Sequence, residues 1–261
     1  MKNYSEYIVI GGGAAGCAVT SRLLKNNKKV ILFEAGHHHN HFLLNWPAGF
    51  FKLINKSKFA IYHKTKPQEH LNRRINIIPQ GNVLGGGTSI NAQVYMRGRS
   101  QDYDEWNEIL RFNNDKETWS WKEVLPYFCE METNANFKNE YHSQKGPLKV
   151  SNSSYINELT KDFVKSVSEL GVEITDDFNK LEQRGVGFYQ FMNSKGKRSS
   201  AATSFIDPEI NNINLNLKLN SEIIKIIIEN NKAIGVEYID RKGRHLRHFA
   251  EKEVILSAGS F

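Results

Sequence analysis

The sequence has 261 residues, of which 39% are hydrophobic and 24% charged, a composition typical of a soluble globular protein with one large or two small domains. Lys and Arg total 35 against 28 Asp and Glu, which gives a net charge of +7. The basic residues are scattered and form no basic helix or aromatic–basic module, so the sequence argues against a nucleic-acid-binding protein.

The N-terminus and the two cysteines bear on the cellular compartment. The chain runs directly into its first expected strand without a signal peptide, and no apolar run is long enough to span a bilayer. Cys17 and Cys129 lie far apart and form no C-x-x-C pair, so we expect neither a disulfide framework nor a metal site. These features predict a reducing, cytoplasmic compartment.

The stretch Tyr7–Gly36 organises the rest of the chain. An apolar run, Tyr7–Ile10, predicts a buried parallel strand and is followed by G-x-G-x-x-G at Gly11, Gly13 and Gly16. A helix to Asn26 and a second strand ending at Glu34 complete a βαβ pattern. In such a motif the glycines allow a tight turn, close approach of a pyrophosphate and close helix–strand packing.

This order of elements predicts dinucleotide binding, with the pyrophosphate at the helix N-terminus and the ribose diol on Glu34. An acid at position 34 disfavours a 2′-phosphate and therefore NADP, but the motif does not separate NAD from FAD. The alternative is a glycine turn in an α/β domain that binds no ligand.

The next segments are expected to be peripheral. The run from His37 to His41 indicates a solvated loop at the rim of the nucleotide site rather than a metal site. The aromatic stretch Phe42–Phe51 predicts a packed loop, and short strands are expected in Tyr62–Gln68 and Ile75–Pro79.

A second glycine-rich stretch follows at Gly81–Gly98 and includes Gly85-Gly-Gly87-Thr-Ser. Its exposed N–H groups could bind phosphate or a flat polar ring, although a plain glycine-rich turn explains it equally well.

Here the sequence resembles the glucose–methanol–choline (GMC) oxidoreductases, the FAD-dependent alcohol oxidases and dehydrogenases, and most closely the choline and aliphatic-alcohol dehydrogenases. The resemblance covers essentially the whole chain. The segments that carry it are Gly81–Asn91, Asp102–Trp106, Trp119–Phe128, Gly146–Val150, Gly185–Tyr189, Gly196–Ala202, Ala233–Tyr238 and Val254–Phe261.

The resemblance implies an α/β fold: a doubly wound, Rossmann-like FAD-binding domain with the start of an inserted α+β substrate domain, the C-terminal half of the family fold being absent. The expected division is 1–150 for the first part of the FAD-binding domain, 151–197 for a partial substrate-binding domain and 198–261 for the continued FAD-binding domain. The implied reaction oxidises choline or a primary alcohol by hydride transfer to flavin N5, with oxygen, a quinone or a dye as acceptor.

The resemblance also implies a set of cofactor-binding residues. Those expected around the ADP half are Gly11, Gly13, Ala14, Ala15, Gly16, Glu34 and Ala35, with the Ile223 backbone at adenine. Those expected along the flavin are Val83, Gly87, Asn91, Ala92, Gln93 and Val94, and Ala258 and Gly259 are expected to face the nucleotide.

Three positions depart from the family pattern. Gln80 and Asn82 stand where the family often has Arg and Lys, which removes two charges near the flavin. Ile90 stands where some members carry a histidine bonded covalently to the flavin, so we expect non-covalent FAD.

The remainder predicts one helix and several strands. Apolar periodicity in residues 153–170 predicts an amphipathic helix packed on a core and ended by Gly171. Strands are expected at Phe188–Met192, Leu215–Leu219, Ile223–Ile228, Ala233–Ile239, His245–Phe249 and, as a final buried strand, Val254–Leu256. The basic residues near the turn Asp240–Gly243 indicate a solvated hairpin end, and weak peripheral contact with the inner membrane is the less favoured interpretation.

No catalytic residue is expected in this chain. The family takes its base, a histidine, from a C-terminal segment beyond Phe261. Four of the nine histidines lie at 37–39 and 41, and the other five, His63, His70, His142, His245 and His248, lie in segments expected to be peripheral. We therefore expect a poorly soluble chain that does not turn over alcohols alone. The alternatives are an NAD-dependent oxidoreductase and a non-catalytic FAD-binding remnant.

Overall fold

The computed structural model describes residues 4–113, 116 and 118–261, which form two compact units. The first unit comprises Met1–Ala92 with Gly196–Phe261, and the middle unit comprises Gln93–Lys195. Residues 93–150 therefore belong to the same compact unit as residues 151–195. The expected division instead placed a domain boundary between residues 150 and 151 and returned the chain to the FAD-binding domain at residue 198. Which unit binds substrate stays a prediction.

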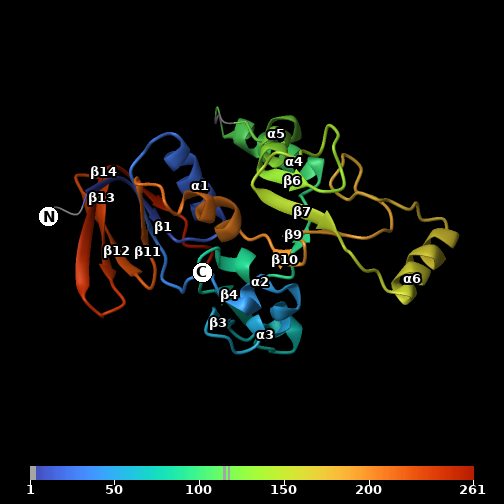
Figure 1. Ribbon diagram of the computed structural model, residues 1–261, viewed down its shortest axis with the longest axis horizontal. Helices are drawn as coiled ribbons and strands as arrows, with labels where there is room; N and C mark the ends of the chain where they lie inside the picture. The colour runs from blue at the N-terminus through green and yellow to red at the C-terminus, as the bar shows by residue number, and fades with distance from the viewer. Residues whose placement is uncertain (1–3, 114–115, 117) are drawn as a thin grey trace. The chain divides into compact units, whose positions relative to one another are not determined.

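A six-stranded sheet forms the centre of the first unit, in the order β11-β2-β1-β14-β13-β12 (Figure 1). Strands β11, β2, β1 and β14 are parallel, and Ile8 of β1 pairs with Ile31 of β2 and Val254 of β14. Strands β12, β13 and β14 are antiparallel. The bounds are β1 Tyr4–Ile10, β2 Val30–Phe33, β11 Leu215–Lys218, β12 Glu222–Glu229, β13 Lys232–Ile239 and β14 His245–Leu256.

Alternation along β1 and β2 sends side chains to two separate cores, as expected for buried strands. On one face Val9 and Leu32 pack with Cys17 and Leu24 of helix α1 and with Ile206. On the other face the core contains Ile8, Ile10, Ile31, Phe33, Val236 and Tyr238. The α/β fold is thus confirmed, with helical segments on one face of the parallel strands and residues of β13 on the other.

The remaining elements of the first unit are short apart from α1. They are α1 Ala14–Lys25, α2 Phe42–Asn45, α3 Phe50–Leu53, β3 Ala60–Lys64, β4 Ile77–Gly81, β10 Lys197–Arg198 and the single turns of helix Pro47–Gly49, Glu69–Leu71, Gly86–Ser89, Ala202–Ile206 and Asp207–Glu209. The packed loop expected at Phe42–Phe51 is wrong, because this stretch is helical. Phe42 and Phe51 are also exposed rather than packed.

The expected strands His245–Phe249 and Val254–Leu256 are one continuous strand, β14. Its first half pairs with β13, and its second half pairs with β1. Val254 and Ile255 are half-buried and Leu256 is 65% exposed, so the expectation of a final buried strand is wrong. At the adjacent hairpin, Arg244 and Arg247 form exposed ion pairs with Asp240 and Glu237, which agrees with a solvated hairpin end.

In its described residues, the middle unit combines a small sheet, in the order β5-β8-β7-β6, with the helices α4, α5 and α6. Tyr95, Leu148 and Val150 form its apolar core. The bounds are β5 Val94–Tyr95, α4 Ser100–Phe112, α5 Trp121–Met131, β6 Glu132–Asn134, β7 Leu148–Asn152, α6 Glu158–Glu169, β8 Gln190–Phe191 and β9 Asn193–Ser194.

Helix α6 confirms the predicted periodicity but not the predicted packing. Gly171, with φ of +88°, follows its end as expected. Val164 is buried, whereas Leu159, Phe163 and Leu170 are 77%, 63% and 84% exposed. The apolar face of this helix is therefore largely uncovered.

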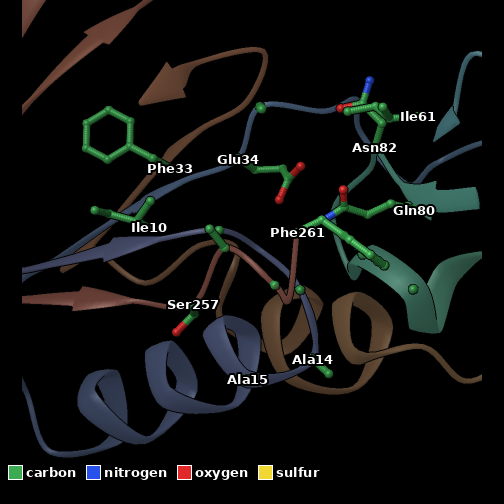
Figure 2. Close-up of a pocket in the computed structure, with 18 of the residues that line it drawn as sticks. Ile10, Ala14, Ala15, Phe33, Glu34, Ile61, Gln80, Asn82, Ser257 and Phe261 are labelled. Carbon is green, nitrogen blue, oxygen red and sulfur yellow. The ribbon is translucent and has the colours of Figure 1, made fainter. Parts of the chain in front are cut away.

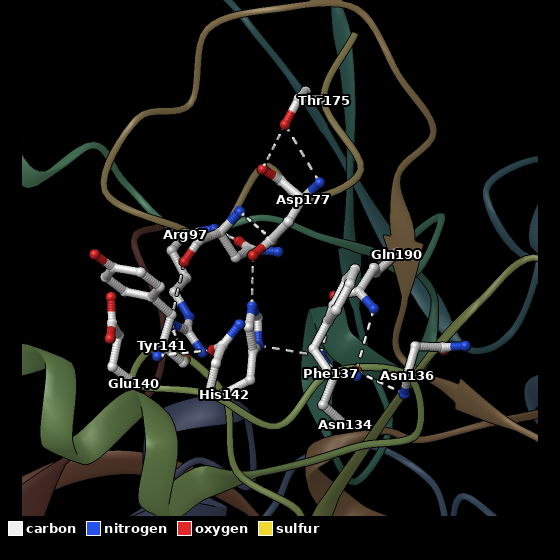
Figure 3. Close-up of polar contacts among 12 residues, drawn as sticks. Arg97, Asn134, Asn136, Phe137, Glu140, Tyr141, His142, Thr175, Asp177 and Gln190 are labelled. Carbon is white, nitrogen blue, oxygen red and sulfur yellow. Dashed lines mark hydrogen bonds and ion pairs between the residues drawn. The ribbon is translucent and has the colours of Figure 1, made fainter.

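Charged side chains of the middle unit contact one another in its interior (Figure 3). His142 Nδ1 lies 2.7 Å from a Glu132 carboxylate oxygen, and Nε2 lies 2.9 Å from an Asp177 carboxylate oxygen. Arg97 lies 3.2 Å from the second Glu132 oxygen. We call these four residues the buried ion cluster; each is at most 5% exposed.

No helix in the described part of the chain is long and apolar enough to cross a membrane.

Candidate functional site

A pocket of about 680 Å³ opens in the first unit where β1, β2 and β14 end (Figure 2). This is the edge of a parallel sheet at which ligands of doubly wound folds bind. The lining residues are Ile10, Gly11, Gly13–Ala15, Phe33–Ala35, Ile61, Pro79–Asn82, Gly86, Gly87, Ser221–Ile223 and Ser257–Phe261.

The first glycine motif builds the floor of this pocket. Gly11 has φ of +95°, and a Cβ there would lie 2.5 Å from the Ser257 carbonyl oxygen. A Cβ on Gly16 would collide with the Gly11 carbonyl, so this glycine allows α1 to approach the turn. A Cβ on Gly13 would meet nothing within 4 Å. Gly13 therefore faces open space, which is what a closely approaching ligand requires.

The second glycine stretch packs directly on the first. The Gly85 N–H donates to the Gly12 carbonyl at 2.6 Å, and a Cβ on Gly86 would lie 2.9 Å from the Gly13 Cα. Gly87 resembles Gly13 in that a Cβ there would meet nothing within 4 Å. The two stretches thus form one backbone surface that is open on the pocket side.

The N-terminus of α1 adds hydrogen-bond donors to this surface. The first intrahelical bond is from the Cys17 N–H to the Gly13 carbonyl, at 3.0 Å. The N–H groups that precede it in a helix have no intrahelical acceptor and carry the positive end of the helix dipole. Ala14 and Ala15, at this end, both line the pocket. The end of the helix is consequently suited to a phosphate.

Glu34 is the carboxylate at the end of β2. One of its oxygens accepts from the Gly12 N–H at 2.7 Å and the other from the Gly36 N–H at 2.8 Å. Burial raises the pKa of Glu34, and the two backbone hydrogen bonds oppose that shift. Each oxygen has further acceptor capacity, so the carboxylate remains able to bind a diol.

The opposite edge of the pocket is polar but uncharged. Gln80 Oε1 accepts a hydrogen bond from His63 Nε2 at 2.6 Å. Gln80 and Asn82 both line the pocket, facing the space near Glu34 (Figure 2). Among the described lining residues there are two carboxylates, Glu34 and Glu222, and no Lys, Arg or His. A bound phosphate would depend on backbone donors.

The structure brings together ten of the predicted cofactor-binding residues. Those that line the pocket are Gly11, Gly13, Ala14, Ala15, Glu34, Ala35, Gly87, Ile223, Ala258 and Gly259. Gly16 supports the floor from behind.

The other five predicted residues do not line this pocket. Val83 is fully buried in a core with Leu44 and Ile90. Asn91 accepts hydrogen bonds from Arg198. Ala92 is the last residue of the first of the two segments that make up the first unit. Gln93 and Val94 belong to the middle unit.

Several lining residues were not predicted as ligands. Among them are Ser221 and Glu222, which precede the predicted Ile223, and Ser257, whose N–H donates to the Ile10 carbonyl at 2.8 Å. Gln80 and Asn82 were noticed only as departures from the family pattern. Their position beside the second glycine stretch is the signal that could have assigned them to the site.

Three histidines differ from their expected places. His142 and His248, expected in peripheral segments, are 2% and 5% exposed. Burial lowers the pKa of His248 to about 4. His63, also expected to be peripheral, contacts the lining residue Gln80 and stacks on Phe261.

The histidine run is partly solvated. His38 is exposed, whereas His39 is buried and contacts Asp207 at 3.0 Å, so the expected solvated loop is wrong at His39. The described residues contain no group of three or more His, Cys, Asp or Glu side chains placed to hold a metal ion.

The family model for GMC oxidoreductases matches residues 5–261. The chain belongs to the GMC oxidoreductase family. Two curated relatives are an alcohol dehydrogenase [acceptor] of Pseudomonas putida, 38% identical over 220 residues, and an oxygen-dependent choline dehydrogenase of Sinorhizobium fredii, 35% identical over 215. These matches cover 84% and 82% of this chain but 39% and 38% of the relatives.

Two solved structures show the same fold. A pyridoxine 4-oxidase from Mesorbium loti superposes with a TM-score of 0.89 at 25% identity, over 98% of this chain and 50% of that one. A formate oxidase of Aspergillus oryzae RIB40, studied for FAD modification, gives 0.89 at 25% identity over 100% and 46%. This GMC chain therefore spans about two fifths of the length of its curated relatives and about half of the solved chains.

Proposed function

We propose that this chain binds FAD and forms the N-terminal part of an oxidoreductase that acts on CH–OH donors, choline or a primary alcohol. The observation that carries the proposal is the backbone surface of the two glycine stretches, with open space beside Gly13 and Gly87. The names of the curated relatives supply the substrate class.

The residues present fit the ADP half of FAD. The α1 N-terminus and Gly13 would hold the pyrophosphate, Glu34 would accept hydrogen bonds from the ribose, and the Ser221–Ile223 backbone would meet adenine. When bound, FAD supplies the redox chemistry by accepting a hydride. The protein's part in this region is to bind and orient the cofactor.

We further propose that the FAD is non-covalent. Ile90 has no nucleophilic atom, and its side chain is buried in the core with Val83 and Leu44. Acid precipitation of the yellow protein should release all the colour into the supernatant. Colour retained in the pellet would overturn this part of the proposal.

The test of cofactor binding is titration of the apoprotein with FAD, comparing wild type with Gly13→Ala. Gly13 has φ of −77°, so alanine is compatible with its backbone, and the added methyl would occupy only the ligand's space. We expect an affinity loss of about tenfold or more, equivalent to about 1.4 kcal/mol, with little change in melting temperature. Gly243→Ala, in the surface hairpin, should bind FAD like wild type. Because Gly243 has φ of +75°, this variant is a control for FAD affinity and not for melting temperature.

An NAD-dependent oxidoreductase is the second candidate, because the first glycine motif and Glu34 suit either dinucleotide. Parallel titration with NAD separates the two. Binding of NAD but not FAD would replace the proposal, and binding of neither would overturn it.

The substrate step is tested by turnover. We propose that no histidine of this chain acts as the base, so choline and short and medium primary alcohols should give less than about 1 s⁻¹ with a dye acceptor. Faster turnover would point first to His63, which contacts the pocket edge. Three further statements stay predictions: that oxygen or a quinone is the electron acceptor, that the protein is cytoplasmic, and that it makes weak peripheral contact with the inner membrane.

A further inference from the structure

Arg198 is a buried cation behind the second glycine stretch. It is the last residue of β10 and is 4% exposed. Nε donates to the Leu44 carbonyl at 2.9 Å, and Nη1 donates to the Asn91 carbonyl and Oδ1, both at 2.8 Å. Nη1 also lies 3.2 Å from the Thr88 carbonyl.

Every acceptor of this guanidinium is neutral. Backbone carbonyls and one amide oxygen surround it, Nη2 has no hydrogen-bond partner in the described structure, and none of the ion pairs found there includes Arg198. Burial lowers the pKa of Arg198 to about 10, so the group stays protonated at neutral pH. Its charge is therefore buried without compensation, a costly arrangement that an anionic partner would relieve.

The segment that Arg198 holds is the one that lines the pocket. Thr88 lies within the helical turn Gly86–Ser89, and Asn91 follows this turn by two residues. Gly86 and Gly87 of the same turn line the pocket. Thr88 is held a second time, because its Oγ1 accepts from the Ala201 N–H at 2.9 Å and donates to the Gly85 carbonyl at 2.6 Å. Arg198 and Ala201 thus hydrogen-bond to Thr88 and Asn91 of this loop, the same loop that lines the pocket.

The lining residues themselves carry no cation. A cofactor with a pyrophosphate, and with a flavin that becomes more negative on reduction, would find Arg198 as a positive charge one layer behind the pocket wall. Charges act over such distances in a protein interior because the effective dielectric constant is low.

We propose that Arg198 is a positioning residue of the FAD site whose charge favours reduced over oxidised FAD. The proposal depends on the proposed function. Hydride transfer would break the substrate's C–H bond and move two electrons and one proton to oxidised FAD, while the substrate's hydroxyl proton passes to a general base. The alcohol then becomes an aldehyde, and reduced FAD is one charge more negative. The guanidinium stabilises that added charge and keeps the Gly85–Asn91 loop in the shape that meets the ring.

The test is the midpoint potential of bound FAD in wild type, Arg198→Lys and Arg198→Gln, measured by dye-equilibrated reduction. Arg198→Gln should lower the potential. Relative to the dissociation constant of oxidised FAD, that of reduced FAD should then rise about tenfold or more. Arg198→Lys should retain most of the wild-type potential because it retains the charge. Arg244→Gln removes a cation from the exposed hairpin and should leave the potential unchanged.

Should Arg198→Gln fail to fold, Asn91→Asp serves as the second variant. It keeps the acceptor for Nη1 and places a compensating carboxylate beside the guanidinium, and it too should lower the potential. An unchanged potential in Arg198→Gln or Asn91→Asp, or an equal fall in Arg198→Lys, overturns the role of the charge. Wild type that binds no FAD overturns the proposed function instead, and this inference with it.

Discussion

The pocket of the first unit and the buried ion cluster of the middle unit are both polar, but they are built in opposite ways. The polar part of the pocket consists mainly of glycine backbone, N–H groups at one helix N-terminus and the carboxylates Glu34 and Glu222, with open space in front of Gly13 and Gly87. The cluster consists of four ionisable side chains that contact one another: Arg97 and His142 contact Glu132, and His142 also contacts Asp177. Polar groups left open to space are available to a ligand, whereas those paired with each other hold a fold together.

The difference is also one of charge balance. In the cluster Arg97 and His142 offset Glu132 and Asp177, so little net charge is buried. Such groups depend on one another, because removing one partner leaves another buried charge without compensation. The pocket has no such balance, which makes it sensitive to what binds there. Substitutions in the two regions should therefore affect different measurements.

The largest effect is expected from Glu132→Gln. Glu132 is fully buried and contacts both Arg97 and His142, so the substitution leaves two cations facing one carboxylate. We expect a loss of about 3–5 kcal/mol in the free energy of unfolding, measured by urea denaturation.

Glu169→Gln is the matched control for Glu132→Gln. Glu169 pairs with Lys165 at 4.0 Å on the surface of α6, and exposed pairs of this kind contribute at most about 1 kcal/mol. Equal effects of the two substitutions would mean that the buried ion cluster does not stabilise the middle unit.

Gly16→Ala sharpens the comparison within the pocket. An alanine methyl would collide with the Gly11 carbonyl, so we expect a loss of about 1–3 kcal/mol in stability, as overpacking usually costs. Gly13→Ala should leave stability nearly unchanged, since its methyl meets no protein atom. Thermal melting of the two variants without cofactor measures the difference. Similar melting temperatures would contradict the assignment of Gly16 to packing and Gly13 to the ligand.

Glu34→Ala tests the one carboxylate of the βαβ motif. Loss of a hydrogen bond to a charged group should weaken FAD binding by about 1–3 kcal/mol in a titration of the apoprotein. Because Glu34 also accepts from Gly12 and Gly36, Glu34→Gln is the comparison that keeps one acceptor in place. Unchanged affinity in Glu34→Ala would mean that Glu34 does not contact the ribose.

The sequence predicted the pocket well because its information is local. Strand, glycines, helix, strand and acid follow one another within Tyr7–Gly36, and parallel pairing then brings their ends together. The second glycine stretch was identified by composition and resemblance. Its contact with the first, the hydrogen bond from Gly85 to Gly12, joins residues far apart in the chain, and no local pattern predicts it.

The mistaken expectations have separate physical causes. The helix at Phe42 is capped by His41, whose Nδ1 accepts from the Leu43 N–H, and histidine is not among the usual N-cap residues. Strand β14 continues through the charged residues Glu251–Glu253 because all three are exposed, and Lys252 pairs with Glu6. Charged residues in a sequence also resemble surface residues. The buried ion cluster therefore gave no signal.

The smallest effect expected is on pH dependence, from His142. Burial lowers the pKa of this imidazole, but the hydrogen bonds to Asp177 and Glu132 outweigh burial and raise it above its ordinary value of about 6.5. Because the folded-state pKa is the higher one, the stabilisation is fully present below pH 6.5 and is lost as the pH rises through the folded value. Asp177 behaves in the opposite sense: its pKa is lowered despite burial, so its contribution is lost only in acid.

The middle unit should consequently be most stable in mildly acidic solution. Three of the four tryptophans, Trp106, Trp119 and Trp121, lie in this unit, so tryptophan fluorescence reports mainly on its unfolding. Between pH 6 and 9 the free energy of unfolding of wild type should fall by more than that of His142→Gln, because only wild type loses a stabilising imidazolium. His245→Gln, an exposed histidine of the first unit, should follow wild type. Parallel pH profiles for wild type and His142→Gln would show that the imidazole carries no charge in the folded protein, and that the buried ion cluster holds one cation rather than two.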